Sequence, residues 1–469
     1  MNYHKITPED ISALSAFISD SDRVITKPTE HWDHDQFKTI RAMPDLVIQP
    51  VTDEEVQQVV KYASDHHIPL VPRGNSTGLM GANLSIDGGI SLDMIKMNKI
   101  LEYDPSSLTM TVQAGARLKD IEGYLSDKPF TYMPAPAMHW ATIGGNVDTN
   151  AGGLKAIKYG VTREHIRKIK VVLTDGKIYR FGAKSVKSSS GYSLKDLIIG
   201  SEGTLGVVTE VTVRLYPRPK EIINALIPFP TLDQAIKSVP AILESGVVPT
   251  TVEFMGRQVL DLWEKYSGTE FPVKEGNGFI IVGIDAFTRE EVEAELKVAL
   301  ASTKEFGSLQ ALVLNADDPE AKLIWKAREE LLLAIQKSTP MMDEVDISVP
   351  INRIPEVLQR INELEKEAKM RIPNFGHAGD GNLHIYLCSD QDSPDDFHKK
   401  GHYVISELYK KAREVDGNMS GEHGIGYARQ EYYQDFYGKD YTDLLRKVKA
   451  VFDPNGVINP DKIFHLEDK

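Results

Sequence analysis

The stretch that most constrains the fold is "DLVIQPVTDEEVQQVVKYASDHHIPLVPRG", at residues 45–74. Its apolar residues Leu46 to Ile48 predict a strand. Thr52 and Glu55 then match a capping box that opens an amphipathic helix. A second apolar run, "IPLVP", predicts another strand that leads directly into a glycine-rich loop. A strand, a helix and a strand at this spacing form a βαβ unit, whose two strands run parallel.

The rest of the chain indicates further domains. Its 469 residues exceed what one hydrophobic core usually organises, so two or three domains are expected. Short β-rich segments follow the βαβ unit as far as Pro217 and Pro219, which mark a natural boundary. Beyond it strands alternate with helices, and Thr231 and Thr288 are expected to cap two of these helices. This pattern predicts an α+β sheet of the ferredoxin-like kind, followed by a mostly helical tail.

Composition excludes several classes of protein. The net charge of −14 argues against nucleic acid as a partner. The single cysteine, Cys388, excludes an intrachain disulfide and a cluster of iron and sulfur held by about four thiolates. No apolar run reaches the roughly 20 residues of a membrane helix, and the acidic N-terminus does not look like a signal peptide. We therefore expect a cytoplasmic protein without a transmembrane segment.

Three glycine-rich loops predict a site for a bound anion. They read "PRGNSTGLMG" at 72–81, "TIGGNVDTNAGG" at 142–153 and "GSEGTLG" at 200–206. Glycine lets backbone N–H groups approach an anion closely, and small hydroxyl and amide side chains add further donors. Such loops suit a pyrophosphate. None of them matches G-x-G-x-x-G between a strand and a helix, or a Walker loop, so neither a Rossmann nor a P-loop fold is predicted.

These loops also carry a resemblance to a known family. "VPRGNSTGLMGA", "TIGGNVDTNAGGLKAIKYG" and "GSEGTLGVVTEVTVRL" resemble the FAD-binding domain of the vanillyl-alcohol oxidase and p-cresol methylhydroxylase superfamily. "GHAGDGNLH", "SGEHGIG" and "NPDKIF" resemble C-terminal signatures of its branch of GlcD-like glycolate oxidases and D-lactate dehydrogenases. The resemblance thus spans nearly the whole chain. It implies four segments: an N-terminal helical segment at 1–41, a PCMH-type FAD-binding domain of two subdomains at 42–219, a ferredoxin-like cap domain with the metal loop at 220–396, and a helical segment at 397–469 that returns to the FAD domain.

The resemblance also implies which residues bind FAD. The first loop should cradle the pyrophosphate, the second should wrap the flavin and its phosphates, and the third should line the same site. The expected FAD-binding residues are Pro72, Arg73, Gly74, Asn75, Ser76, Thr77, Gly78, Thr142, Gly144, Gly145, Asn146, Asn150, Gly152, Gly153, Glu202, Gly203, Gly206 and Asn459. Some members of the superfamily attach FAD through a histidine or cysteine in the N-terminal loops. The first loop here has neither, so we expect noncovalent FAD.

Two later loops gather histidines and a glutamate. His377 and His384 flank "AGDGN", which favours a turn over a helix, and "LHIYL" should continue as a strand. Such a turn can bring both imidazoles together. Two histidines and one carboxylate are typical ligands of a first-row divalent ion with open coordination positions. The resemblance assigns His377, His384 and Glu422 as ligands of zinc or manganese, while the adjacent His423 faces the substrate.

A 2-hydroxy acid suits such a site. Its carboxylate and hydroxyl can chelate the ion, which lowers the pKa of the hydroxyl, and His423 can then accept the hydroxyl proton as the catalytic base. Hydride leaves Cα for flavin N5, and a 2-oxo acid remains. Arg328, in "WKAREEL", resembles the family's arginine that binds the substrate carboxylate. Asp380 is expected to form the turn rather than to act as a catalyst.

We expect a small D-2-hydroxy monocarboxylate, D-lactate or glycolate, as substrate. Relatives that oxidise D-2-hydroxyglutarate carry a lysine just before the segment matching "DISVP". Here Asp343, Glu344 and Val345 stand at that place, and no lysine or arginine occurs from Ser338 to Asn352. Acidic side chains there should repel a second carboxylate.

Several alternatives stay open from the sequence. They are a D-2-hydroxyglutarate dehydrogenase, a metallohydrolase, and a flavin subunit of a multi-subunit glycolate oxidase or another electron-transfer complex. The electron acceptor is equally open between oxygen, a quinone, an electron-transfer flavoprotein and an iron–sulfur subunit.

Overall fold

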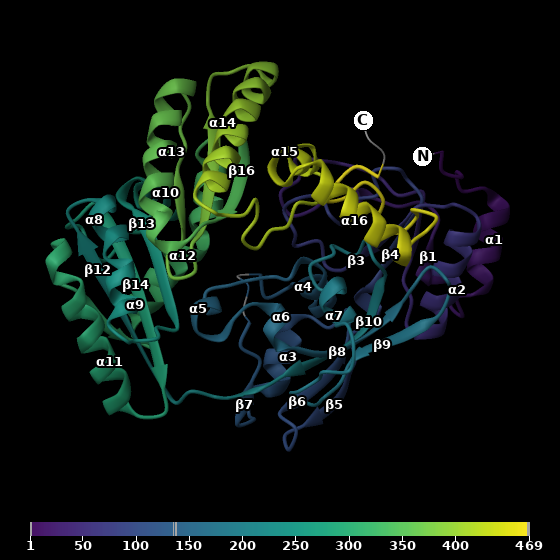
Figure 1. Cartoon of the computed structure of the whole chain (residues 1–469), viewed down its shortest axis with the longest axis horizontal. Coiled ribbons are helices and arrows are strands. Elements are labelled where there is room, and N and C mark those ends of the chain that lie inside the picture. Colours follow the sequence, from purple (N-terminus) through teal and green to yellow (C-terminus); the bar gives the residue numbers. More distant parts are fainter. Residues whose placement is uncertain (1, 135, 137, 467–469) are drawn as a thin grey trace. The chain divides into compact units, whose positions relative to one another are not determined.

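The computed structural model describes residues 2–134, 136 and 138–466. The chain divides into two compact units (Figure 1). The first unit comprises Met1–Gly153, Gly160–Arg218 and Glu422–Lys469, and the second comprises Leu154–Tyr159 and Pro219–Gly421. Helices and strands are both abundant, so the expected α+β class is confirmed. No helix among the described residues is both long and apolar enough to cross a lipid bilayer.

The first unit opens with a four-stranded sheet in the order β1-β2-β4-β3. Its strands are β1 (Val24–Ile25), β2 (Leu46–Ile48), β3 (Leu70–Arg73) and β4 (Ile90–Asp93). Both β2 and β3 pair in parallel with β4, so the predicted βαβ unit is confirmed with a third strand between its two strands. Apolar residues of α1 (Pro8–Ala16) and α2 (Asp53–Asp65), including Leu14, Val56 and Val60, form a core with this sheet.

The capping box expected at Thr52 forms only in part. The Thr52 hydroxyl accepts the amide N–H of Glu55 (3.1 Å), as expected. The Glu55 carboxylate, however, does not reach back to Thr52 but binds Arg23 (2.6 and 2.7 Å) and the amide of Val51 (2.7 Å). The guanidinium of Arg23 is buried and needs a counter-charge, so this ion pair takes precedence over the cap.

An antiparallel sheet forms the second half of the first unit, in the order β5-β6-β10-β8-β9. Its strands are β5 (Ile100–Asp104), β6 (Thr109–Gln113), β8 (Ile166–Val172), β9 (Ile178–Gly182) and β10 (Val207–Arg214), while β7 (Phe130–Thr131) and β11 (Tyr216–Pro217) form a separate pair. The helices of this half are α3 (Leu118–Leu125), α4 (Ile143–Thr149), α6 (Thr162–His165) and α7 (Leu194–Ile198). Val112, Ile121, Val147 and Val211 pack in its core.

The C-terminus returns to the first unit. After α15 (Tyr433–Tyr437) and α16 (Lys439–Phe452), the chain runs alongside β3. Leu70 donates its amide to Val457 O (2.8 Å), and Asn459 donates its amide to Leu70 O (2.7 Å). The buried Lys449 of α16 donates to Thr204 O and Ile458 O, at 2.6 Å each. The C-terminal segment therefore packs against the third glycine loop, to which Lys449 is hydrogen-bonded.

The second unit is built on a seven-stranded antiparallel sheet in the order β15-β12-β14-β13-β17-β18-β16. Its strands are β12 (Glu221–Phe229), β13 (Thr251–Gly256), β14 (Gly278–Ala286), β15 (Leu312–Asn315), β16 (Met341–Ser348), β17 (Asn374–His377) and β18 (Asn382–Ser389). The first four make two split β-α-β passes, as expected of a ferredoxin-like sheet. The helices are α5 (Ala156–Tyr159), α8 (Leu232–Lys237), α9 (Val239–Glu244), α10 (Arg257–Ser267), α11 (Arg289–Ser302), α12 (Pro319–Lys337), α13 (Ile354–Ala368) and α14 (Pro394–Glu414).

The observed units differ from the expected segments in three ways. The second unit extends past residue 396 to Gly421, because α14 packs against α13 and β16 (Figure 1). It also takes in the short segment Leu154–Tyr159, where the Lys158 ammonium and the Tyr159 hydroxyl both bind the buried carboxylate of Asp285 (2.6 and 3.0 Å). The N-terminal segment at 1–41 contains the strand β1 as well as helix α1.

Candidate active site

The two histidines of "HAGDGNLH" lie on either side of the turn of a β-hairpin in the second unit. His377 ends β17 and His384 lies in β18, so the predicted turn between them is confirmed. Asp380 accepts the amide of Asn382 (3.2 Å) and thus forms the turn, as expected. Gly381 has φ 85°, and a Cβ there would lie 1.9 Å from Val349 O, so only glycine fits. The two imidazole centroids are 5.1 Å apart.

Acidic and histidine side chains share one face of this sheet. His384 pairs with Asp346 of β16 and with Phe375 of β17, and His377 pairs with Glu253 of β13. Directly paired residues of antiparallel strands project to the same face, and so do residues two apart on one strand. Glu344 therefore lies on the face of His384, whereas Asp343 lies on the opposite face.

The carboxylate of Glu253 joins His377 to Arg328. One oxygen lies 2.7 Å from His377 Nδ1, and the other accepts the Nε–H of Arg328 at 2.8 Å and lies 2.6 Å from its Nη2. Both Glu253 and Arg328 are buried, and the guanidinium also stacks on the ring of Phe375 (4.6 Å). The expected substrate-binding arginine is thus held by an ion pair. The contact at Nδ1 fixes the orientation of the His377 ring.

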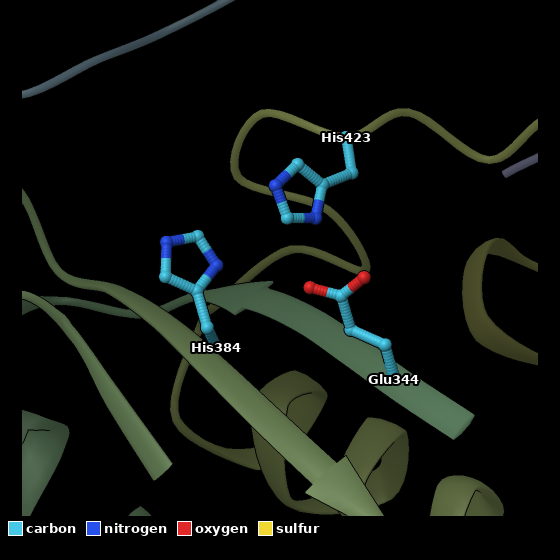
Figure 2. A group of neighbouring side chains, drawn as sticks. All are labelled: Glu344, His384 and His423. Atoms are coloured by element: carbon cyan, nitrogen blue, oxygen red, sulfur yellow. The ribbon is translucent and has the colours of Figure 1, made fainter. Parts of the chain in front are cut away.

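Asp346 fixes the start of "SGEHGIG" to the end of β16. One of its oxygens accepts the Ser420 hydroxyl (2.7 Å) and the Gly421 amide (3.0 Å), and the other accepts Asn382 Nδ2. Glu422 and His423 are the next two residues of the chain. One ligand atom each of His377, His384 and Glu422 lies within 4.8 Å of the other two, and the same holds for Glu344, His384 and His423 (Figure 2). The expected ligands are therefore brought together, and a second carboxylate, Glu344, joins them.

The three glycine loops lie together in the first unit. Asn75 of the first loop donates its side-chain amide to Trp140 O (3.0 Å), next to the second loop. Gly200 of the third loop donates its backbone amide to Val147 O of the second (2.9 Å). Asn459 links the third loop to the residue that follows the first loop, because its side chain donates to Glu202 O (2.7 Å) and Ala82 O (2.8 Å).

Several expected FAD-binding residues use their side chains to build these loops. Arg73 is buried and donates to backbone oxygens of the N-terminal segment, including His31 O (2.7 Å), and burial lowers its pKa to about 10. The Asn150 side chain accepts the amide of Arg163 (2.9 Å). Glu202 accepts amides of the "SGEHGIG" segment, and burial raises its pKa to about 7 against the effect of those amides. These side chains therefore shape the loops.

Other polar atoms of these loops, and one of Asn459, are buried and have no hydrogen-bond partner among the described residues. They are Asn146 Nδ2, Asp148 Oδ1, Ser201 Oγ and Asn459 Oδ1. Buried polar atoms normally find a partner, so such a group of donors and acceptors points to a polar ligand. FAD, which carries hydroxyl, carbonyl and amide groups along its length, fits this requirement.

Comparison with known sequences identifies the family. A family described as "FAD linked oxidases, C-terminal domain" matches residues 218–463, and one described as "FAD binding domain" matches residues 44–182. The chain is 39% identical over 468 residues to a D-lactate dehydrogenase of Anaerostipes hadrus, with 98% of each chain covered. The chain belongs to the FAD-linked oxidases. This confirms the resemblance seen in the motifs, and with it the assignment of FAD and of oxidoreductase chemistry.

This FAD-linked oxidase is also similar to other members of the family. It is 34% identical to the glycolate oxidase subunit GlcD of Bacillus subtilis, with 92% of each chain covered. It is 33% identical to a D-2-hydroxyglutarate dehydrogenase of Xanthomonas citri, with 95% of each chain covered. A crystal structure of p-cresol methylhydroxylase shares the fold, with a TM-score of 0.78 at 16% identity, over 98% of this chain and 97% of that one.

Glu253 and Asp346 lie at the histidines and were not among the expected site residues. Glu344 also lies there, although it was expected only to repel a second carboxylate of the substrate. A signal for Glu344 and Asp346 existed, because acidic residues at alternate positions of the segment "DEVDISVP" share one face if the segment forms a strand. Glu253 interrupts the apolar run "TTVEFM", and a carboxylate in a buried strand requires a charged or hydrogen-bonding partner.

Proposed function

We propose that this FAD-linked oxidase is a metal-assisted dehydrogenase that converts a small D-2-hydroxy monocarboxylic acid to the 2-oxo acid. The observation that carries this proposal is the meeting of two imidazoles and a carboxylate, His377, His384 and Glu422, in a chain of this family. Neighbours of the ligands support a metal as well, because Glu253 holds His377 Nδ1 in the way that metal-binding histidines are usually held.

Each partner in the reaction has a defined task. Bound FAD supplies the acceptor for the hydride that leaves Cα. A zinc or manganese ion on these ligands would supply a Lewis acid that lowers the pKa of the substrate hydroxyl. His423 takes the hydroxyl proton as general base, so the substrate loses one proton and one hydride and becomes the 2-oxo acid.

Arg328 holds the substrate carboxylate in this proposal. A guanidinium has five N–H donors, and the ion pair with Glu253 uses donors on Nε and Nη2. The donors that remain can bind one carboxylate, in an orientation that Glu253 fixes. Glu344 and Asp346 add negative charge on the same face, and the chain from Ser338 to Asn352 contains no lysine or arginine. The arrangement therefore favours a substrate with one carboxylate over one with two.

Substrate preference tests this proposal directly. The flavin should bleach on anaerobic mixing with D-lactate or glycolate. With an artificial dye as acceptor, kcat/KM for the better of these two should exceed that for D-2-hydroxyglutarate by at least about 10-fold. The second carboxylate of D-2-hydroxyglutarate would lie near acidic side chains, and this repulsion costs more than the roughly 1.4 kcal/mol that corresponds to a factor of 10. L-lactate serves as the matched control for stereochemistry. A clear preference for D-2-hydroxyglutarate would contradict the substrate assignment, and a flavin that no 2-hydroxy acid bleaches would contradict the proposed function.

FAD should be bound noncovalently. The loop "PRGNSTG" contains neither histidine nor cysteine, and Cys388, the only cysteine of the chain, lies in the other unit and is buried. Acid precipitation should therefore release the yellow chromophore into the supernatant, where absorbance and mass spectrometry identify it as free FAD. A pellet that stays yellow would show a covalent bond.

A further inference from the structure

Glu202 occupies a strained position in the third glycine loop. Its φ of 52° lies in the left-handed region, and the residue is 6% exposed. The backbone is held on both sides, because its amide donates to Asp148 O (2.6 Å) and its carbonyl accepts Asn459 Nδ2 (2.7 Å). Strain at a residue that is not glycine persists where its surroundings enforce it, and it commonly accompanies a functional requirement.

The carboxylate of Glu202 holds two consecutive amides of the "SGEHGIG" segment. One oxygen accepts the amide of Ile425 and the other accepts the amide of Gly426, both at 2.7 Å. Gly424 has φ 80°, and a Cβ there would lie 2.8 Å from Glu202 Oε1, so the segment rests directly on the carboxylate. Hydrogen bonds of this kind, from N–H to a carboxylate, are roughly twice as strong as those between neutral groups.

The far end of the same segment is held by the first glycine loop. The amides of Tyr427 and Ala428 both donate to Met80 O, at 2.9 and 3.0 Å. All these contacts lie within the first unit. His423 therefore directly precedes a stretch of backbone that is hydrogen-bonded to two of the glycine loops. The hydrogen bonds nearest to the histidine are those to the Glu202 carboxylate.

We propose that Glu202 is a positioning residue, which fixes the loop carrying His423 to the FAD-binding loops, and that it is not a ligand of the FAD phosphates. Both of its oxygens already accept backbone amides, so the side chain presents no donor to a phosphate oxygen. The inference rests on the proposed function, in which His423 is the base, and it gives Glu202 a task different from the cofactor contact that the motif implies.

Amide hydrogen exchange tests, independently of activity, whether Glu202 restrains the loop through the amides of Ile425 and Gly426. In Glu202→Gln the side chain keeps one acceptor oxygen and turns an NH₂ group toward the other amide. Exchange at Ile425 or Gly426 should accelerate by about 10-fold, the factor equivalent to one lost hydrogen bond, while the FAD content per chain stays that of the wild type. Glu55→Gln is the matched control, since Glu55 is equally buried in the first unit and also accepts a backbone amide. It should leave exchange at Ile425 and Gly426 unchanged.

A double-mutant cycle tests whether Glu202 acts through His423. Glu202→Gln should slow anaerobic flavin reduction by D-lactate by about 10- to 10²-fold, because a small misplacement of a catalytic group has effects of this size. In the His423→Ala background the same change should cause no further loss. Loss of FAD from Glu202→Gln, or an equal slowing in both backgrounds, would overturn the inference and make Glu202 a cofactor ligand. If no 2-hydroxy acid reduces the wild-type flavin, the proposed function fails, and the exchange measurement still decides whether Glu202 holds the loop.

Discussion

His423→Ala is expected to lower the rate of flavin reduction by about 10²- to 10⁴-fold, the contribution usual for a general base, while both FAD and the divalent metal stay bound. His423 is not among the proposed ligands, and the FAD contacts come from the glycine loops. Stopped-flow reduction by D-lactate, together with metal analysis and flavin absorbance, measures all three quantities. Added imidazole should restore part of the rate if the missing group is a base.

The control for this experiment is His398→Ala, because His398 is an exposed histidine of α14 and should leave the rate unchanged. The structure also offers a second set of potential ligands, Glu344, His384 and His423. Loss of the metal together with activity in His423→Ala would favour that set and would contradict the assignment of His423 as the base.

His384→Ala should remove both the metal and turnover, by on the order of 10²-fold or more, because His384 belongs to both sets of potential ligands. FAD should stay bound, since His384 lies in the second unit and the glycine loops lie in the first. Metal content by mass spectrometry, flavin absorbance and steady-state turnover check the result. Full turnover of wild-type enzyme after complete removal of the metal would contradict metal assistance.

Glu253→Gln should weaken metal binding, whereas His384→Ala should abolish it. The side chain keeps its size but loses the charge that holds His377 Nδ1 and Arg328, and changes of such outer partners commonly weaken metal binding by 10- to 100-fold. Excess metal should therefore restore turnover to Glu253→Gln but not to His384→Ala. Thermal unfolding of both variants separates this effect from the cost of leaving the Arg328 charge buried without its partner.

Local patterns made part of this site predictable from the sequence. A Gly-Asp-Gly turn between two histidines specifies a hairpin whatever surrounds it, so the proximity of His377 and His384 could be predicted. The role of Glu253 could not, because it depends on the pairing of β13 with β17, which are more than 100 residues apart in the chain. The same holds for Arg328. Its helix pattern indicates a residue near the surface, and only the position of Glu253 explains why the guanidinium is buried.

Two predictions from local sequence patterns were wrong in part because contacts with distant parts of the chain took precedence. Thr52 and Glu55 have the spacing of a capping box, but the buried charge of Arg23 takes the glutamate away from the helix end. The cap domain was expected to end at residue 396, where the mostly helical tail begins. The structure continues the second unit to Gly421 because α14 has an apolar face that packs on α13 and β16. The partners that decide these cases lie in other elements, and a pattern read along one segment does not contain them.

The return of the C-terminus to β3 has a consequence for biosynthesis. Asn459 binds Ala82 O across 377 positions of sequence, and Leu70 pairs with Val457 and Asn459. During translation the N-terminal half therefore leaves the ribosome long before the residues that close its sheet and support its third glycine loop. Contacts between residues so far apart in the sequence form late. Until they form, β3 is an edge strand of the nascent chain with unpaired backbone groups. Flavin loading should follow release of the finished polypeptide, and chains that end before residue 457 should emerge without the cofactor and depend on chaperones to stay unaggregated.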